Sequence, residues 1–181
     1  AIGDGDHGVN MAKCFRAVRK KLSESQEENF EEILRGVGMV VLNAVGGAMG
    51  ALYGTFFLKL AQGSAGKKVL ELGDLVKMFQ TAEKGILELG KAKLGDKTLI
   101  DTLSPAVRSL ENSEKEGKAL PEALLHFVNA ARQGMESTKD LIAKMGRASR
   151  LGERTIGHQD AGATSCYFIL KSMSEGFVGS V

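Results

Sequence analysis

The chain has 181 residues, 43% of them hydrophobic, which is the length of one domain with enough apolar side chains for a single core. Only 2 prolines, 6% aromatic residues and no Trp favour helices over a β-sandwich or barrel. The net charge of +2, with dispersed basic residues, argues against nucleic acid as a partner, and the distant Cys14 and Cys166 fit a reducing compartment. We therefore expect one cytoplasmic, all-α domain over residues 1–181.

Apolar residues that recur at steps of three and four predict seven helices. In chain order they span approximately residues 8–22, 27–46, 48–62, 72–90, 99–110, 121–145 and 163–177. Gly46-Gly47 and the turn at Gly95-Asp96-Lys97 separate neighbouring helices, and Pro105 is expected to bend or restart the fifth. The predicted architecture is an antiparallel helical bundle or barrel.

One stretch requires a membrane alternative to be weighed. Residues 37–58 contain no charged side chain and are long enough to span a bilayer. Asn43, Tyr53, Thr55 and five glycines dilute this stretch, and Gly46-Gly47 is typical of a helix break. We therefore favour a protein that does not enter the membrane.

The chain opens with a glycine-rich acidic loop, in which Asp4 and Asp6 stand two residues apart directly before a helix. Two such carboxylates suit Mg²⁺, which binds one or two protein carboxylates together with phosphate oxygens. The alternative is an Asp-Gly turn that caps the helix, and the spacing alone does not choose between them. The loop fits neither an EF-hand nor, with its acidic residues and no preceding strand, a dinucleotide fingerprint.

Two further segments offer groups that bind phosphate. Gly46-Gly47-Ala48-Met49-Gly50 presents closely spaced backbone N–H groups at a helix start, although spacing alone favours close helix packing. Residues 146–162 hold three arginines and four glycines without a sustained period, which indicates a functional, cationic loop. Solvated arginines paired with Glu153 and Asp160 are the alternative for this loop.

Four motifs in this order resemble one family: GDGDHG, GGAMGALYGTFF, GDKTLIDTLSPA and GRASRLGERTIGHQDAGATS. The chain is similar, from Ala1 to its last helix, to the ADP-binding L subunits of dihydroxyacetone kinases. The resemblance implies an eight-helix antiparallel barrel with the nucleotide at one end. Seven helices are visible and no Met begins the chain, so we expect one further helix before Ala1.

The resemblance also implies a set of site residues. Three aspartates would hold two Mg²⁺ ions; Asp4 and Asp6 match two of them, and the third belongs before Ala1. Arg147 would lie near the phosphates and take the catalytic role. The remaining nucleotide contacts would come from His7, Gly8, Val9, Asn10, Ala48 and Met49 on the phosphate side and from Gly90, Leu99, Asp160, Ala161 and Gly162 on the nucleoside side.

The implied activity is transfer of the terminal phosphoryl group of Mg-bound ATP to dihydroxyacetone held by a K subunit. A phosphohistidine M subunit of the PEP-dependent phosphotransferase system would then rephosphorylate the bound ADP. Two alternatives stay open: a domain of an ATP-exchanging kinase, and a regulatory subunit that signals to a transcriptional regulator. Met49 departs from the Ser usual in the family, so weaker phosphate contacts are expected there.

Overall fold

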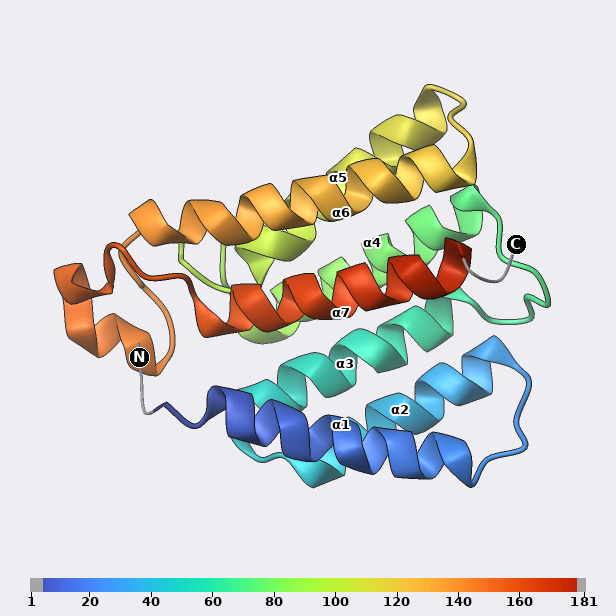
Figure 1. Cartoon of the computed structure of the whole chain (residues 1–181), viewed down its shortest axis with the longest axis horizontal. Helices are drawn as coiled ribbons and strands as arrows, with labels where there is room; N and C mark the ends of the chain where they lie inside the picture. Colours follow the sequence, from blue (N-terminus) through green and yellow to red (C-terminus); the bar gives the residue numbers. More distant parts are fainter. Residues whose placement is uncertain (1–4, 179–181) are drawn as a thin grey trace. The chain divides into compact units, whose positions relative to one another are not determined.

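The computed structural model describes residues 5–178, and within them it is helical, with no strand, as predicted (Figure 1). Residues 8–91 form one compact unit, and residues 5–7 with 92–178 form another. The elements are α1 (His7–Ser23), α2 (Phe30–Ala44), α3 (Gly47–Gly63), α4 (Leu72–Gly90), α5 (Ile100–Lys115), α6 (Leu120–Ser137), the 3₁₀-helices η1 (Thr138–Asp140) and η2 (Arg147–Thr155), and α7 (Ala161–Val178).

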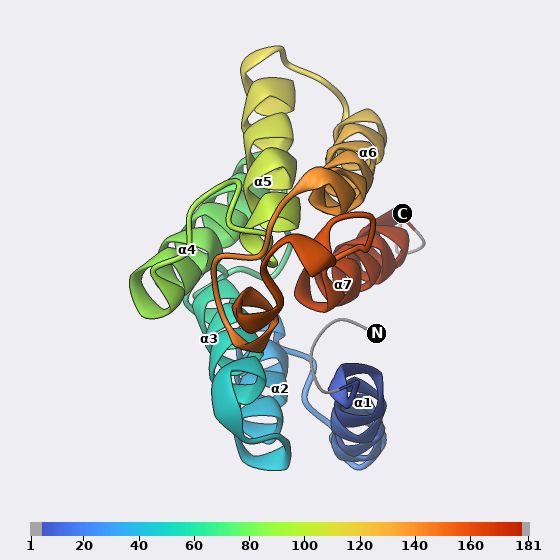
Figure 2. The ribbon, with the colours of Figure 1, turned by 90° about the vertical axis from the view of Figure 1, so that its left-hand side faces the viewer.

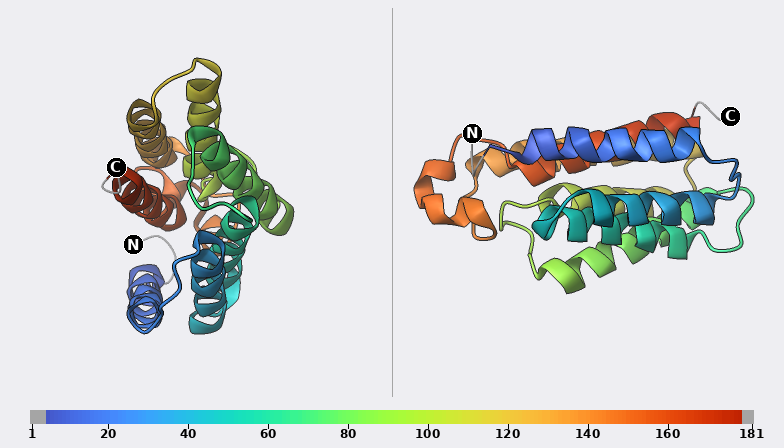
Figure 3. Two further views of the ribbon diagram at one scale, coloured as in Figure 1. Left: turned by 90° about the vertical axis from the view of Figure 1, so that its right-hand side faces the viewer. Right: turned by 90° about the horizontal axis from the view of Figure 1, so that it is seen from below.

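In the unit of residues 8–91, α3 packs between α2 and α4 (Figure 3). Glycines make the α2–α3 contact close: a Cβ on Gly54 would stand 2.3 Å from Leu42 Cγ, and one on Gly38 would stand 2.8 Å from Leu58 Cγ. Gly38 and Gly54 of the uncharged stretch therefore serve helix packing. None of the helices within residues 5–178 has the length and apolar character needed to cross a membrane.

Capping side chains explain where two helices of this unit begin. The Asn29 side chain accepts hydrogen bonds from the backbone N–H groups of Glu31 and Glu32, which starts α2 three residues later than the predicted position 27. Glu71 and Asp74 form a reciprocal capping box at the start of α4. Local side-chain chemistry thus sets these boundaries.

In the other unit, α5, α6 and α7 pack together (Figure 1). Their core is made of side chains that are at most 1% exposed, including Leu103, Leu110, Leu124, Phe127 and Leu170. Pro121 lies in the first turn of α6, as predicted. Of the two outcomes expected at Pro105, the restart is wrong, because α5 runs through it as one helix, and the bend stays a prediction.

The prediction that the sixth helix continues to residue 145 is also wrong. α6 ends at Ser137, and after η1 the backbone is extended at Leu141. Thr138 lies at this end, where its hydroxyl donates to the Met135 carbonyl at 2.6 Å. The predicted loop of residues 146–162 contains η2, which Gly152 interrupts with φ 55° (Figure 2). The segment between α6 and α7 is therefore folded, but not as a continuous α-helix.

Candidate functional site

The residue before α7, Asp160, is held from both sides. Its carboxylate Oδ2 accepts the Ala163 N–H at 2.7 Å, and its own N–H donates to Thr138 Oγ1 at 3.0 Å. Burial raises the pKa of Asp160, while the Ala163 N–H and the charge of His7 act in the opposite direction. Asp160 thus presents a partly buried carboxyl at the first turn of α7, next to Ala161.

His7 lies beside the same turn. Its Nε2 is 2.9 Å from Ser165 Oγ, and the serine hydroxyl also lies 3.0 Å from the Ala161 carbonyl oxygen. Burial lowers the pKa of His7, and the negative charges of Asp160 and Asp6 oppose that shift. A neutral imidazole hydrogen-bonded to α7 follows from this environment.

Leu99 and Gly162 are also neighbours at this turn. A Cβ built on Gly162 would lie 3.6 Å from the Leu99 backbone nitrogen and 3.0 Å from Asp160 Oδ2. Leu99 itself is buried at the start of α5. Five residues of the predicted nucleotide site therefore gather around the start of α7, from three distant parts of the sequence: His7, Leu99, Asp160, Ala161 and Gly162.

Of the two predicted metal ligands, the structure describes one. Asp4 lies outside the described residues, whereas Asp6 is exposed and follows Gly5, whose φ of 72° suits glycine. Within residues 5–178 there is no group of three His, Cys, Asp or Glu side chains that could hold a metal ion. A single exposed carboxylate is a chemically suitable Mg²⁺ ligand, and the two-ion site stays a prediction.

The unit of residues 8–91 holds six further predicted contacts. Gly8 and Val9 are exposed in the first turn of α1, Asn10 is half-buried there, and Gly90 ends α4. Met49 is half-buried in the first turn of α3, directly after the exposed Ala48. These residues occupy helix ends, where backbone groups have no partner within their own helix.

The glycine motif before α3 divides into two parts. Gly46 and Gly47 are exposed, and a Cβ on either would meet no atom within 4 Å. Gly47 has φ 71°, and no side chain caps this helix. By contrast, a Cβ on Gly50 would collide with the Val45 carbonyl oxygen at 1.8 Å. The first two glycines leave backbone open to a ligand, and the later ones serve packing.

Arg147 begins η2 directly after Gly146, whose φ is 65°, and its side chain is exposed. Arg150 and Arg154 on the same segment are exposed as well. The arginines that give this segment its predicted cationic character therefore lie on its surface.

Lys97 and Asp101 hold the chain on either side of Leu99, and the sequence analysis gave neither a role. The Asp101 carboxylate accepts the N–H groups of Gly95 at 2.6 Å and Thr98 at 2.7 Å, and the buried Lys97 ammonium donates to main-chain carbonyls of the segment after α6. The sequence showed only a Gly-Asp-Lys turn. The one available signal was a lysine, Lys97, in the short glycine-containing turn between the fourth and fifth predicted helices.

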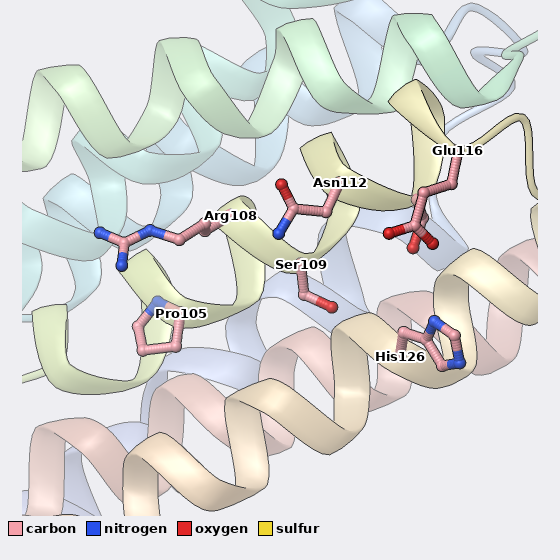
Figure 4. Close-up of a pocket in the computed structure, with 7 residues that line it drawn as sticks. Pro105, Arg108, Ser109, Asn112, Glu116 and His126 are labelled. Atoms are coloured by element: carbon pink, nitrogen blue, oxygen red, sulfur yellow. The ribbon is translucent and has the colours of Figure 1, made fainter.

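A pocket of about 260 Å³ lies elsewhere, between α5 and α6 (Figure 4). Figure 4 shows Arg108 and Asn112 along α5, Glu116 directly after its end, and His126 on α6. Its lining contains none of the predicted site residues. The pocket is therefore separate from the residue cluster at the start of α7.

Comparisons with known proteins all point to one family. The DAK2 domain model matches residues 1–175. The chain is 42% identical to the ADP-binding subunit DhaL of the PEP-dependent dihydroxyacetone kinase of Escherichia coli, covering 96% of this chain and 82% of that one. It is 30% identical to human triokinase/FMN cyclase, covering 97% of this chain but 30% of that protein.

Solved structures similar to this chain belong to the same group of kinases. The native dihydroxyacetone kinase of C. freundii has a TM-score of 0.72 and 27% identity, over 97% of this chain and 29% of that one. The same enzyme in complex with AMP-PNP and Mg²⁺ has a TM-score of 0.69 and 25% identity, over the same shares of both chains. The resemblance drawn from the four sequence motifs is confirmed by these matches.

Proposed function

Because the chain belongs to the DAK2 domain family, we propose that it is the ADP-binding subunit of a PEP-dependent dihydroxyacetone kinase. The observation that carries the proposal is the gathering of His7, Leu99, Asp160 and Gly162 at the first turn of α7. The motif resemblance implies that these residues lie near the nucleotide, and the solved relative in complex with AMP-PNP and Mg²⁺ supports a nucleotide as the ligand.

In this proposal the start of α7 receives the nucleoside. Leu99 and Gly162 supply an apolar surface with close backbone approach, and Ala161 completes it. Asp160 supplies hydrogen-bond acceptors while it holds the first turn of α7. Gly162 leaves room that a larger side chain would fill.

The phosphate groups would bind where backbone N–H groups are open. The N–H groups of Ala48 and Met49 at the start of α3 serve this role, supported by the absence of a side-chain cap and by the open backbone at Gly46-Gly47. Gly8 to Asn10, in the first turn of α1 within the same unit, offer a second helix start for phosphate. Helix N-termini favour negative charge through their aligned peptide dipoles.

Asp4 and Asp6 would hold magnesium with the nucleotide phosphates. Bound Mg²⁺ would neutralise phosphate charge, which is the largest electrostatic demand of phosphoryl transfer. Arg147 would bind the terminal phosphoryl group with its planar guanidinium and stabilise the charge that moves during transfer. These residues bind and neutralise, and none of them is assigned a role as base.

The proposed reaction moves the terminal phosphoryl group from ATP to a hydroxyl of dihydroxyacetone. The bond from phosphorus to the ADP oxygen breaks, a bond to the sugar oxygen forms, and the hydroxyl proton passes to a group of the sugar-binding partner. A K subunit would hold the sugar, and a phosphohistidine M subunit would return a phosphoryl group to ADP in place. The protein would work in the cytoplasm.

An ATP-exchanging kinase domain is the second candidate. The higher identity to the separate PEP-dependent subunit than to the longer triokinase favours the first. A regulatory subunit that contacts a transcriptional regulator has only Met49 in its favour.

The test is a transfer assay with the full-length protein and its K and M partners. Dihydroxyacetone phosphate should form from PEP with a catalytic amount of ADP. Formation from ATP alone, without the M subunit, at an equal rate would favour the ATP-exchanging kinase, and no product from either donor would reject the kinase proposal.

A further inference from the structure

The Lys97 side chain is the most deeply buried charged group in the unit of residues 5–7 and 92–178, with 1% of its surface exposed. Its Nζ lies within hydrogen-bond distance of four main-chain carbonyl oxygens. The distances are 2.5 Å to Thr138, 3.0 Å to Leu141, 2.7 Å to Thr155 and 2.7 Å to His158. An ammonium group has three N–H donors, so the four oxygens share them. Such a ring of carbonyls resembles the coordination of a monovalent cation.

The four carbonyls come from both ends of one segment. Thr138 and Leu141 follow α6, whereas Thr155 and His158 lie at the end of η2. The connecting residues 142–154 contain Arg147. Asp160 follows His158 by two residues. The ammonium of Lys97 therefore joins the two ends of the segment of residues 138–158.

Neutral contacts reinforce the same closure. The Ala143 N–H donates to Thr155 Oγ1 at 3.0 Å, and the Gly157 N–H donates to the Lys139 carbonyl at 2.7 Å. Carbonyl oxygens that converge on one point repel each other unless a positive charge lies between them. The closed form of residues 138–158 consequently depends on the charge of Lys97.

The backbone of Lys97 supports a dedicated role. Its φ is 61°, in the left-handed region that L-residues with side chains seldom adopt. Asp101 holds this turn through the N–H groups of Gly95 and Thr98. Glycine would suit the conformation better, so a lysine at this position is explained by its side chain.

We infer that Lys97 is a positioning residue, a fixed ammonium that closes residues 138–158 and thereby orients Arg147 and Asp160 toward the nucleotide. Its effect on the nucleotide rests on the proposed function, whereas its effect on the segment does not. Lys97 takes the place that a bound monovalent cation would occupy in this ring of carbonyls.

The primary variant is Lys97→Gly, which removes the ammonium while accepting the positive φ. Lys97→Met is the second variant, because it keeps an apolar stem and removes only the charge. Lys91→Ala is the matched control: Lys91 has φ 54° but an exposed side chain at the end of α4. Circular dichroism verifies that the helices of each variant are retained.

The first measurement is cleavage by trypsin after Arg150 and Arg154, which needs no nucleotide. Both Lys97 variants should be cleaved in this segment roughly tenfold faster than wild type, because local opening exposes the chain. Lys91→Ala should be cleaved at the wild-type rate. Wild-type resistance of either Lys97 variant would overturn the inference, whatever the protein binds.

Chemical rescue identifies the ammonium as the active group. Added n-butylammonium should restore trypsin resistance to Lys97→Gly but not to Lys97→Met, whose side chain fills the space and which thereby controls for inhibition of trypsin by the amine; n-butanol should restore resistance to neither variant. Equal restoration by both compounds, or by neither, would overturn the inference. With Mg-ADP present, the dissociation constant of Lys97→Gly should rise about tenfold and recover with n-butylammonium, since the positioned residues contact the nucleotide. If wild type bound no ADP, the proposed function would fail while the trypsin result stood.

Discussion

Gly134 in α6 lies against the main-chain oxygen of Asp101 in α5, so that a Cβ on the glycine would stand 2.1 Å from that oxygen. The Asp101 carbonyl receives no helical hydrogen bond from position 105, because Pro105 has no N–H. The proline frees a carbonyl, and the glycine admits it into the α5–α6 contact.

Gly134→Ala should therefore destabilise the protein, because its Cβ forces a backbone shift rather than a side-chain adjustment. The free energy of unfolding should fall by about 1–3 kcal/mol, measured by urea denaturation. Gly36→Ala in α2 is the control: its Cβ meets nothing within 4 Å, and it should stabilise by about 0.5–1 kcal/mol. Equal effects of the two substitutions would contradict the close packing described.

The partly buried carboxyl of Asp160 makes the free energy of unfolding depend on pH. Burial raises the pKa of Asp160 in the folded protein above the ordinary 3.8. At a pH between 3.8 and that raised pKa, Asp160 is therefore protonated more often in the folded protein than in the unfolded chain. The contribution of Asp160 is therefore most favourable below pH 3.8 and declines as pH rises through the folded-state pKa. Asp160→Asn keeps an oxygen that accepts the Ala163 N–H but has no titrating group, so this loss of stability with rising pH should be absent in the variant.

Urea denaturation of wild type and Asp160→Asn from pH 3.5 to 7 provides the measurement. The stability of wild type relative to the variant should fall as pH rises in this range. A difference that is constant with pH, or one that moves in the other direction, would be inconsistent with a raised pKa at Asp160.

Gly46 allows phosphate binding to be separated from stability. Gly46→Ala should leave stability nearly unchanged, because φ is −78° and the space around it is open. If phosphates approach this backbone, its methyl group should weaken Mg-ADP binding roughly tenfold, as loss of one charge-assisted hydrogen bond does. Gly47→Ala, with φ 71°, should by contrast cost about 1–2 kcal/mol of stability. Calorimetric titration with Mg-ADP and urea denaturation give the two values; unchanged affinity for Gly46→Ala would place the phosphates elsewhere.

Arg147 should matter for transfer rather than for folding. The side chain is exposed at the start of η2, so Arg147→Ala should change the free energy of unfolding by less than about 0.5 kcal/mol. The rate of dihydroxyacetone phosphate formation should fall about 100-fold, because one preorganised charge at the moving phosphoryl group is lost. Arg150→Ala, exposed on the same segment, is the matched control and should retain activity. Equal losses in the two variants would assign the effect to surface charge in general.

Much of the fold could be predicted because periodicity is a local property. The apolar spacing that begins at Leu72 ends at Gly90, where α4 ends, and Gly46-Gly47 separates α2 from α3 as expected. The same reasoning failed after Ser137. Leu141 and Met145 continue the helical spacing, but Lys97, 41 positions before Thr138, binds the carbonyls there. A contact that distant leaves no trace in the local pattern.

The site was predictable to a different degree. Motif resemblance identified His7, Leu99 and Asp160, which the structure brings to one helix start. Spacing could not separate the open Gly46 from the packed Gly50, because both stand in one glycine-rich run and only the neighbouring backbone differs. The direction of the Lys97 side chain was equally invisible, since a sequence records a lysine in a turn and not where its ammonium lies.

The most direct test of the account is the nucleotide content of the full-length protein, purified without added nucleotide and analysed by mass spectrometry and phosphorus assay before and after EDTA. The account predicts ADP near one per chain, which survives dialysis and leaves when the chelator removes Mg²⁺. Absence of ADP, together with no binding of added Mg-ADP or Mg-ATP, would contradict it.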